Sequence, residues 1–118
     1  MSVPLIEHDH YLLVPIQSGL TDTELSELRA ALLQRITERH ARGVMIDVSL
    51  LDVVDGFAVR TLSEIGHWAR LQGAPTVIVG LRPEVMQAME RFGLTFQEVA
   101  TAPNWAEGLN VLASGAAK

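Results

Sequence analysis

The sequence predicts an α/β fold in which one mostly parallel mixed sheet packs against helices, in the order ββαβαβαβα. Apolar runs of four or five residues alternate with amphipathic stretches of helical period along the chain. The loops between them are short, which is typical of strands joined through crossover helices. At 118 residues, with 48% hydrophobic and 19% charged residues, the chain has the size and composition of one globular domain.

The first elements expected are two short strands at Leu5–Ile6 and Tyr11–Val14, with a polar turn at Glu7–His10 between them. A long helix follows. Thr21 and Glu24 have the spacing of a capping box, in which the side chain of each residue bonds the backbone amide of the other. Apolar residues then recur at helical spacing, and Gly43 is expected to end the helix. The residues of this apolar face are Leu25, Leu28, Leu32 and Ile36.

The next part of the chain continues with strands and helices by turns. Val44–Val48 and Pro75–Val79 are nearly continuous apolar runs, which is typical of buried strands of a parallel sheet. A helix that begins at Asp55–Gly56 and ends before Gly73 is expected between them. Another helix is expected from Pro83, because proline suits the first helical position. Its expected core face consists of Val85, Met89 and Phe92.

The C-terminal part completes the domain. A last strand is expected at Phe96–Val99, and Asn104 is expected to cap a final helix. The apolar residues of that helix are Trp105, Leu109 and Leu112. We expect a single domain over residues 1–118, with a core over about 5–112 and a frayed tail over 114–118.

The composition favours protein partners by exclusion. The chain has no cysteine, which excludes disulfides, thiolate metal sites and a cysteine nucleophile. No signal peptide and no apolar run long enough to cross a bilayer is visible, so we expect a cytoplasmic protein that does not bind membranes. The net charge of −5, with the basic residues spread along the chain, argues against nucleic acid as a partner.

No catalytic or cofactor-binding pattern stands out. No serine lies in a Gly-x-Ser-x-Gly elbow, and no glycine-rich phosphate-binding loop is present. His8 and His10 could face the same way from a strand, but two imidazoles are too few for a metal site. We therefore expect no enzymatic activity, no cofactor and no metal.

The segment 47–57 is the most distinctive part of the chain. It places three carboxylates, those of Asp47, Asp52 and Asp55, between the end of a strand and the start of a helix. In an α/β fold this loop lies at the carboxyl edge of the sheet, where binding sites usually form. Asp55 is also a natural N-cap, so helix capping alone explains part of the pattern equally well.

Response-regulator receiver domains are one family with such a loop, and Asp47 would then be the phosphorylated residue. Phosphoryl transfer in that family needs an acidic pair after the first strand and a lysine after the last one. This chain has Ser18-Gly19 after the second strand and no lysine before Lys118. The receiver-like reading is therefore a remote alternative.

The chain resembles STAS domains, the sulfate-transporter and anti-sigma factor antagonist family, more closely and over nearly its whole length. The segments that carry the resemblance are Leu12–Gln17, Val44–Val48, Val53–Phe57 and Gly80–Val85. Within the family the chain looks most like the small scaffold proteins of the bacterial stressosome, the RsbS type. The resemblance implies a single SpoIIAA-like STAS fold and a non-catalytic protein-interaction module.

The resemblance also implies a phosphorylation switch, which this chain lacks. In the family, a Ser or Thr directly after the Asp at the start of the second helix is the usual phosphoacceptor. The unmodified loop binds a switch serine kinase or an anti-sigma factor, and phosphorylation releases it. Here that position is Gly56, either natural or an engineered replacement of serine. A second acceptor position of the family falls near Ala88, which has no hydroxyl either.

The resulting hypothesis is a stressosome-type scaffold or anti-sigma factor antagonist that stays competent to bind its partners. Its partner-binding residues are expected to be Asp52, Val54, Asp55, Gly56, Phe57 and Ala58. Other STAS proteins are expected partners in a homo- or hetero-oligomer, through the edge of the Tyr11–Gln17 strand or through helix faces. The alternative is a STAS module that binds a small ligand, such as a nucleotide, at the start of the second helix.

Overall fold

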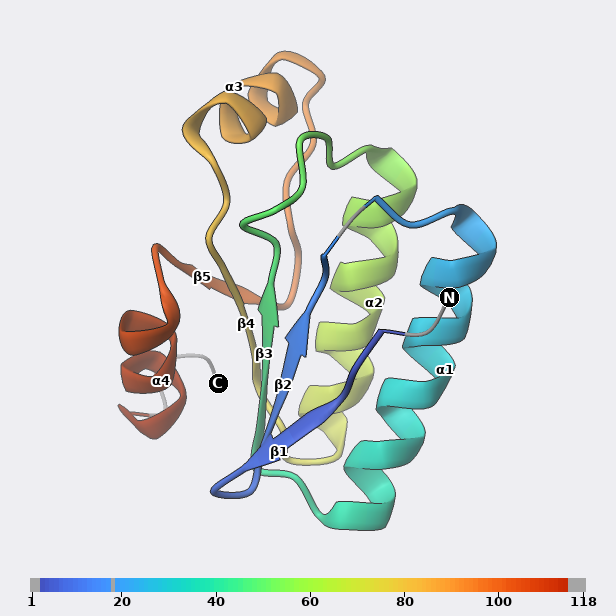
Figure 1. Ribbon diagram of the computed structural model, residues 1–118, viewed down its shortest axis with the longest axis vertical. Coiled ribbons are helices and arrows are strands. Elements are labelled where there is room, and N and C mark those ends of the chain that lie inside the picture. Colours follow the sequence, from blue (N-terminus) through green and yellow to red (C-terminus); the bar gives the residue numbers. More distant parts are fainter. Residues whose placement is uncertain (1–2, 18, 115–118) are drawn as a thin grey trace.

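The computed structural model describes residues 3–17 and 19–114 (Figure 1). The order ββαβαβαβα is confirmed. The elements are β1 Ile6–His8, β2 Tyr11–Pro15, α1 Asp22–Arg39, β3 Gly43–Asp47, α2 Gly56–Leu71, β4 Thr76–Val79, α3 Pro83–Arg91, β5 Ala100–Ala102 and α4 Trp105–Ser114. None of these helices is long and apolar enough to cross a membrane.

The five strands form one mixed sheet in the order β1-β2-β3-β4-β5. β1 runs antiparallel to β2, and the other neighbours are parallel, which confirms the mostly parallel sheet. The hairpin turn consists of Asp9 and His10, which have positive φ angles of 50° and 68°. Glu7 and His8 therefore belong to β1 and not to the turn, because so tight a turn leaves them free to pair with β2.

The position of β2 corrects one expectation about assembly. β2 covers most of Tyr11–Gln17 and is bonded to β1 on one side and to β3 on the other. The proposed association through an edge of this strand was therefore wrong. The edges of the sheet are β1 and β5, which carry the unpaired backbone groups.

Helices cover both faces of the sheet. In Figure 1, α1 and α2 lie against one face, α4 lies against the other, and α3 stands beyond the end of the strands. Side chains of β3 alternate accordingly. Val44 and Ile46 join the core beneath α1 and α2, whereas Met45 joins a smaller core with Leu112 of α4.

The helix starts are those that the sequence predicted. Thr21 and Glu24 form both bonds of the capping box: the Thr21 amide donates to Glu24 Oε1 at 2.9 Å, and the Glu24 amide to Thr21 Oγ1 at 3.1 Å. The bond from the Thr21 backbone also lowers the pKa of Glu24. Pro83 is the first residue of α3, and Asn104 Oδ1 accepts the Glu107 amide at 2.9 Å at the start of α4.

The end of α1 differs from the prediction. The helix ends at Arg39, because His40 adopts a left-handed conformation (φ 50°) and donates its amide to the Ile36 carbonyl. Gly43 instead opens β3 beneath α4. A Cβ there would lie 3.1 Å from a methyl group of Leu112, so this glycine serves close packing and not helix termination.

The last strand also differs, since Phe96–Val99 is not β5. Phe96 and Val99 instead pack against the main core before the strand begins, and Glu98 between them has a positive φ of 66°. Gly66 of α2 permits this crossing, because a Cβ there would lie 2.3 Å from a methyl group of Val99. The apolar residues Phe96 and Val99 thus indicated burial in the core and not membership of a strand.

The remaining corrections concern α3 and the chain end. Val85 and Met89 are buried as predicted, but Phe92 is 76% exposed, because it follows the last turn of α3 beyond the edge of the core. Of the expected frayed tail, Ser114 is the last residue of α4, and residues 115–118 lie outside the described residues. The extent of the domain stays a prediction.

Candidate functional site

The segment between β3 and α2 passes over the carboxyl end of the sheet, next to the start of α3 (Figure 1). Leu51 and Val54 are buried and fasten this loop to the core. Val53 between them is 74% exposed, and the Asp52 side chain is exposed as well. The loop therefore displays an apolar and an acidic side chain on an anchored backbone.

Asp55 ends the loop and caps α2. Its Oδ1 accepts the backbone amide of Ala58 at 2.9 Å, which confirms the capping role that the sequence suggested. Gly56 follows as the first residue of the helix. The cap therefore fixes the direction in which α2 leaves the loop, and with it the position of Gly56.

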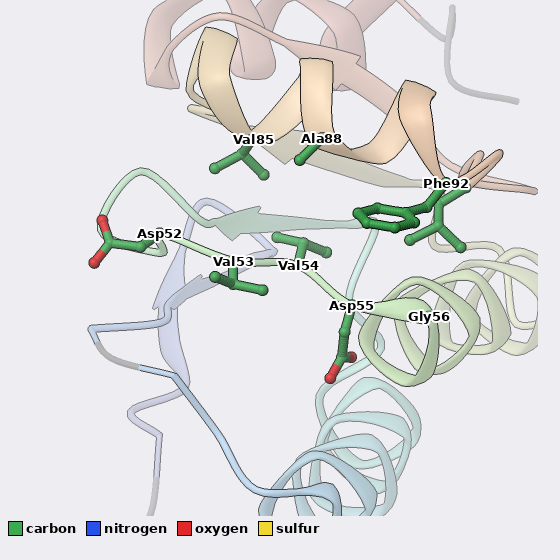
Figure 2. A pocket seen from close by; sticks show the side chains of 9 residues that line it. Asp52, Val53, Val54, Asp55, Gly56, Val85, Ala88 and Phe92 are labelled. Carbon is green, nitrogen blue, oxygen red and sulfur yellow. The ribbon is translucent and has the colours of Figure 1, made fainter.

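A groove of about 340 Å³ lies between this loop and α3 (Figure 2). Its walls are mainly apolar: Val85 and Ala88 project from α3 toward Val53 and Val54 of the loop, and the Phe92 ring lies at the C-terminal end of α3. We call it the Gly56 groove. Its lining residues are Asp52, Val53, Val54, Asp55, Gly56, Val85, Ala88, Phe92 and Leu94.

Gly56 has room for a small side chain. A Cβ at this position would lie 3.3 Å from Arg60 Nη1 and 3.7 Å from Leu94 Cδ2. The nearer atom is the end of a long, exposed side chain that can move away. Ala88 lines the same groove from α3. Gly56 and Ala88, the two positions at which the family carries phosphoacceptors, therefore both line the Gly56 groove.

The structure brings together four of the six predicted partner-binding residues, namely Asp52, Val54, Asp55 and Gly56. The other two lie elsewhere. Phe57 lines a shallow hollow with Thr95 and Gln97, and Ala58 lines another with Ile16 and Leu25. Helical geometry separates these neighbours, because successive residues of a helix point about 100° apart.

Sequence reasoning missed the opposite wall of the groove. The lining residues outside the predicted partner-binding set are Val53, Val85, Ala88, Phe92 and Leu94, of which Ala88 was considered only as a position without a phosphoacceptor hydroxyl. For three of these, no local pattern distinguishes a groove wall from a core position. Phe92 carried a signal, since it lies directly before Gly93 at the end of a helix, where a side chain can leave the core.

Asp47 is not part of the groove. It lies at the end of β3, where its carboxylate accepts hydrogen bonds from the Trp105 indole of α4 and from the Ser49 amide. Burial alone would raise the pKa of Asp47, but these hydrogen bonds outweigh it and lower the pKa below its ordinary value of 3.8. Asp47 thus ties α4 to the sheet, and the three carboxylates of segment 47–57 serve separate purposes.

The other side chains that could act as nucleophiles or metal ligands do not come together in a site. The Thr61 side chain is buried, and the Ser63 hydroxyl accepts the Gln97 amide at 2.9 Å. Within residues 3–17 and 19–114, no three His, Asp or Glu side chains come together in a way that could hold a metal ion. The arrangement of the Gly56 groove suits the binding of an apolar partner surface.

A family model described as the STAS domain matches residues 2–107. The chain belongs to the STAS domain family. This finding confirms the resemblance to STAS domains, which rests on four segments between Leu12 and Val85, and rules out the receiver-like alternative. STAS antagonists and stressosome proteins are non-catalytic, so the expectation of a protein without enzymatic activity is confirmed as well.

Two solved structures resemble this STAS protein over its whole length. Moorella thermoacetica RsbS, in a serine-to-glutamate variant, is 37% identical, with a TM-score of 0.81 and 97% of both chains covered. A chain from a study of the molecular architecture of the stressosome is 34% identical, with a TM-score of 0.75 and coverage of 98% of this chain and 100% of that one. Both similarities place the protein near the stressosome members of the family.

A curated relative is larger than this chain. The RsbT co-antagonist protein RsbRA of Bacillus subtilis is 27% identical over 110 residues, which cover 92% of this chain and 40% of RsbRA. The chain thus spans about two fifths of the length of this relative. The unphosphorylated anti-sigma factor antagonist SpoIIAA, at 13% identity and a TM-score of 0.70, shows a shared fold alone.

Proposed function

We propose that this STAS protein is a cytoplasmic, stressosome-type scaffold that binds other STAS proteins and a switch serine kinase of the RsbT kind through the Gly56 groove. One observation carries the proposal. The most apolar hollow of the loop region lies at the start of α2, in a chain that matches RsbS from end to end. No cofactor is needed for this role.

The distribution of exposed apolar side chains supports a docking role for this end of the molecule. Seven large apolar side chains are exposed among the described residues, and four of them lie in the loop, on α3 or directly after α3. These four are Leu50, Val53, Met86 and Phe92. Two of them, Val53 and Phe92, line the Gly56 groove. Exposed apolar surface of this kind often marks an interaction site, and aromatic residues tend to contribute most to binding.

Gly56 leaves the proposed switch in its binding state. A phosphate at this position would add about −1.5 to −2 charges to an apolar groove and would oppose docking by desolvation and repulsion. Without a hydroxyl, neither Gly56 nor Ala88 can receive one. The protein therefore binds constitutively in this proposal, and release depends on modification of its partners.

The groove lining argues against the nucleotide alternative. The charged side chains among the lining residues are those of Asp52 and Asp55, and both are acidic. The N-terminus of α2, where a phosphate group would bind, is already occupied by the Asp55 cap. A protein surface with apolar side chains matches this lining better.

The test is a binding titration of the purified chain with the RsbT-type kinase and RsbR-type proteins of the same genome. We expect Val53→Asp and Phe92→Ser to weaken binding at least about tenfold, since each removes an exposed apolar contact from the groove. Leu71→Ser is the matched control, because Leu71 is 66% exposed but lies at the other end of α2. Equal affinities for all three variants would contradict the proposal.

A second experiment tests whether a hydroxyl at position 56 restores phosphorylation. Gly56→Ser should become phosphorylated by the cognate kinase with ATP and then lose affinity for it, while the parent chain incorporates no phosphate at this helix. Gly56→Ala is the control for the added volume. Phosphate incorporation into the parent chain at another residue of α2 would move the switch away from position 56.

A further inference from the structure

We infer that Arg82 is a positioning residue for the docking loop: it holds residues 49–54 against the start of α3 and thereby sets the width of the Gly56 groove. The inference deepens the proposed function and rests on it for the role in binding. The contact itself, which we call the Arg82 clamp, rests on hydrogen bonds from Arg82 to residues 49–54 and on the close approach of Gly80 to Ser49.

The Arg82 guanidinium bridges two points of the loop. Its Nε donates to the Ser49 carbonyl at 2.9 Å, and its Nη1 donates to Asp52 Oδ1 at 2.6 Å. The first bond fixes the backbone, and the second fixes a side chain three residues further on. A planar guanidinium can make both bonds at once because its donors form a rigid fork, whereas a lysine offers one ammonium.

Beyond the buried side chains of Leu51 and Val54, the loop makes few other hydrogen bonds to its surroundings. The pairing of β3 with β4 ends where the Val48 amide donates to the Val79 carbonyl at 3.0 Å. The bond from the Leu51 amide to the Val48 carbonyl lies within the segment itself. The Ser49 amide also donates to Asp47 Oδ1 at the end of β3, at 2.8 Å. In the part of the chain that the structure describes, the hydrogen bonds that join residues 49–54 to the start of α3 are the two from Arg82.

Gly80 brings Arg82 within reach of the loop. It has a positive φ of 82°, and a Cβ at this position would lie 2.7 Å from the Ser49 Cβ. The turn between β4 and α3 therefore passes directly against Ser49, which only a glycine allows. Arg82 follows two residues later, so its side chain lies next to its acceptors on Ser49 and Asp52.

The fold does not depend on the Arg82 side chain. Arg82 is the N-cap residue of α3, but its side chain makes no capping bond. The amides of Val85 and Met86 bond its backbone carbonyl, both at 3.0 Å, and any residue supplies that acceptor. Removal of the guanidinium should therefore release the loop without unfolding α3.

The experiment compares Arg82→Ala with the parent chain by hydrogen exchange, by thermal unfolding and by titration with the RsbT-type kinase. We expect exchange of the Leu51 amide to become about fivefold faster, given a main-chain bond and a partly exposed ion pair. The melting temperature should change by less than about 3 °C. Kinase affinity should fall by at least about threefold, as for other residues that order a docking surface.

Two further variants make the test specific. Asp52→Ala removes one of the two bonds, so it should have a smaller effect, and it should add nothing in the Arg82→Ala background. Arg29→Ala removes a similar exposed pair, Arg29 with Glu64 at 3.0 Å between α1 and α2, and should leave exchange over 49–54 unchanged.

The outcomes separate the clamp from the proposed function. Unchanged exchange over 49–54 in Arg82→Ala overturns the clamp. Faster exchange with unchanged kinase affinity overturns the role of Arg82 in docking. Faster exchange in a chain whose parent binds neither kinase nor STAS proteins supports the clamp while the proposed function fails.

Discussion

Gly56 combines an ordinary backbone conformation with space for a side chain. Its φ lies outside the left-handed region, and no atom comes within 3.3 Å of a Cβ placed there. Its helix therefore gains nothing from glycine. The reason for a glycine at this position lies in the absence of a hydroxyl, if the proposed switch is correct, and not in the fold.

We expect Gly56→Ala to raise the free energy of unfolding by about 0.4–1 kcal/mol, because it restricts the unfolded chain without strain in the native one. Gly73→Ala is the control: a Cβ there meets nothing within 4 Å, but the φ of +84° should make it destabilising by about 1 kcal/mol. Urea unfolding of both variants checks the contrast. A change of the same sign in both would show that the backbone conformation does not govern the effect.

Asp47 gives the stability a pH dependence at the acid end. A carboxyl whose pKa is lower in the folded than in the unfolded state stabilises the fold above its ordinary pKa, and this contribution is lost as the pH falls through the folded value. For Asp47, hydrogen bonds from Trp105 and Ser49 produce that lowering against the opposing effect of burial.

We therefore expect the free energy of unfolding to decrease as the pH falls below 3.8, and Asp47→Asn to flatten that decrease. Glu24 also has a lowered pKa, so a residual decrease should remain. Urea titrations over a series of acid pH values measure it. Asp9→Asn, at a side chain that is 82% exposed, serves as the reference. An identical slope for Asp47→Asn and the parent chain would speak against a folded pKa below 3.8.

Among the elements, α4 is the helix that closes the second core. It packs on the face of the sheet opposite α1 and α2 (Figure 1), over Met45, Val77 and Val79. Gly108 brings its backbone close to the strands: a Cβ there would lie 2.6 Å from Val79 Cγ1 and 2.9 Å from Met45 Sδ. Close packing and the Trp105–Asp47 bond together hold this short helix.

Gly108→Ala should lower the free energy of unfolding by about 1–3 kcal/mol, because the added methyl group collides with side chains of two central strands. Helix propensity alone would favour alanine by about 1 kcal/mol, so the sign of the change tests the packing. Asn110→Ala, at an exposed position of the same helix, should be neutral or slightly stabilising. Urea unfolding distinguishes them, and a stabilised Gly108→Ala would mean that α4 can move away at little cost.

For the molecule as a whole, the arrangement of parallel strands creates the docking end. β3 and β4 are parallel neighbours, so the loops that follow them meet at the same edge of the sheet. This is how Ser49 and Arg82, 33 positions apart, come into hydrogen-bond contact. The groove forms between the loop after β3 and α3. In Figure 1 these two segments lie at the far end of the molecule from the β1–β2 turn.

Net charge should oppose self-association at neutral pH. The chain carries −5 at pH 7 and has a pI of about 5.2, so repulsion between copies vanishes in mildly acidic buffer. We expect static light scattering to rise as the pH is lowered from about 7.5 toward the pI, and Phe92→Ser to reduce the rise by removing apolar surface. Scattering that is equal at both pH values would exclude charge as the factor that keeps copies apart.

The sequence by itself determined the order of elements, the helix starts and the family. These features are local: the Thr21–Glu24 box, the Asp55 cap and the alternating apolar runs each act over a few residues. The same holds for about half of the candidate site, since Asp52 to Gly56 are consecutive in the sequence.

Only the tertiary structure decided which apolar residues stay outside the core and what faces Gly56. Phe92 and Phe96 look alike as apolar residues, yet Phe92 is exposed while Phe96 packs against the core. The groove, the Arg82 clamp and the placement of β5 each depend on residues tens of positions apart. Hydrophobic pattern reports that a residue can be buried, and long-range packing decides whether it is.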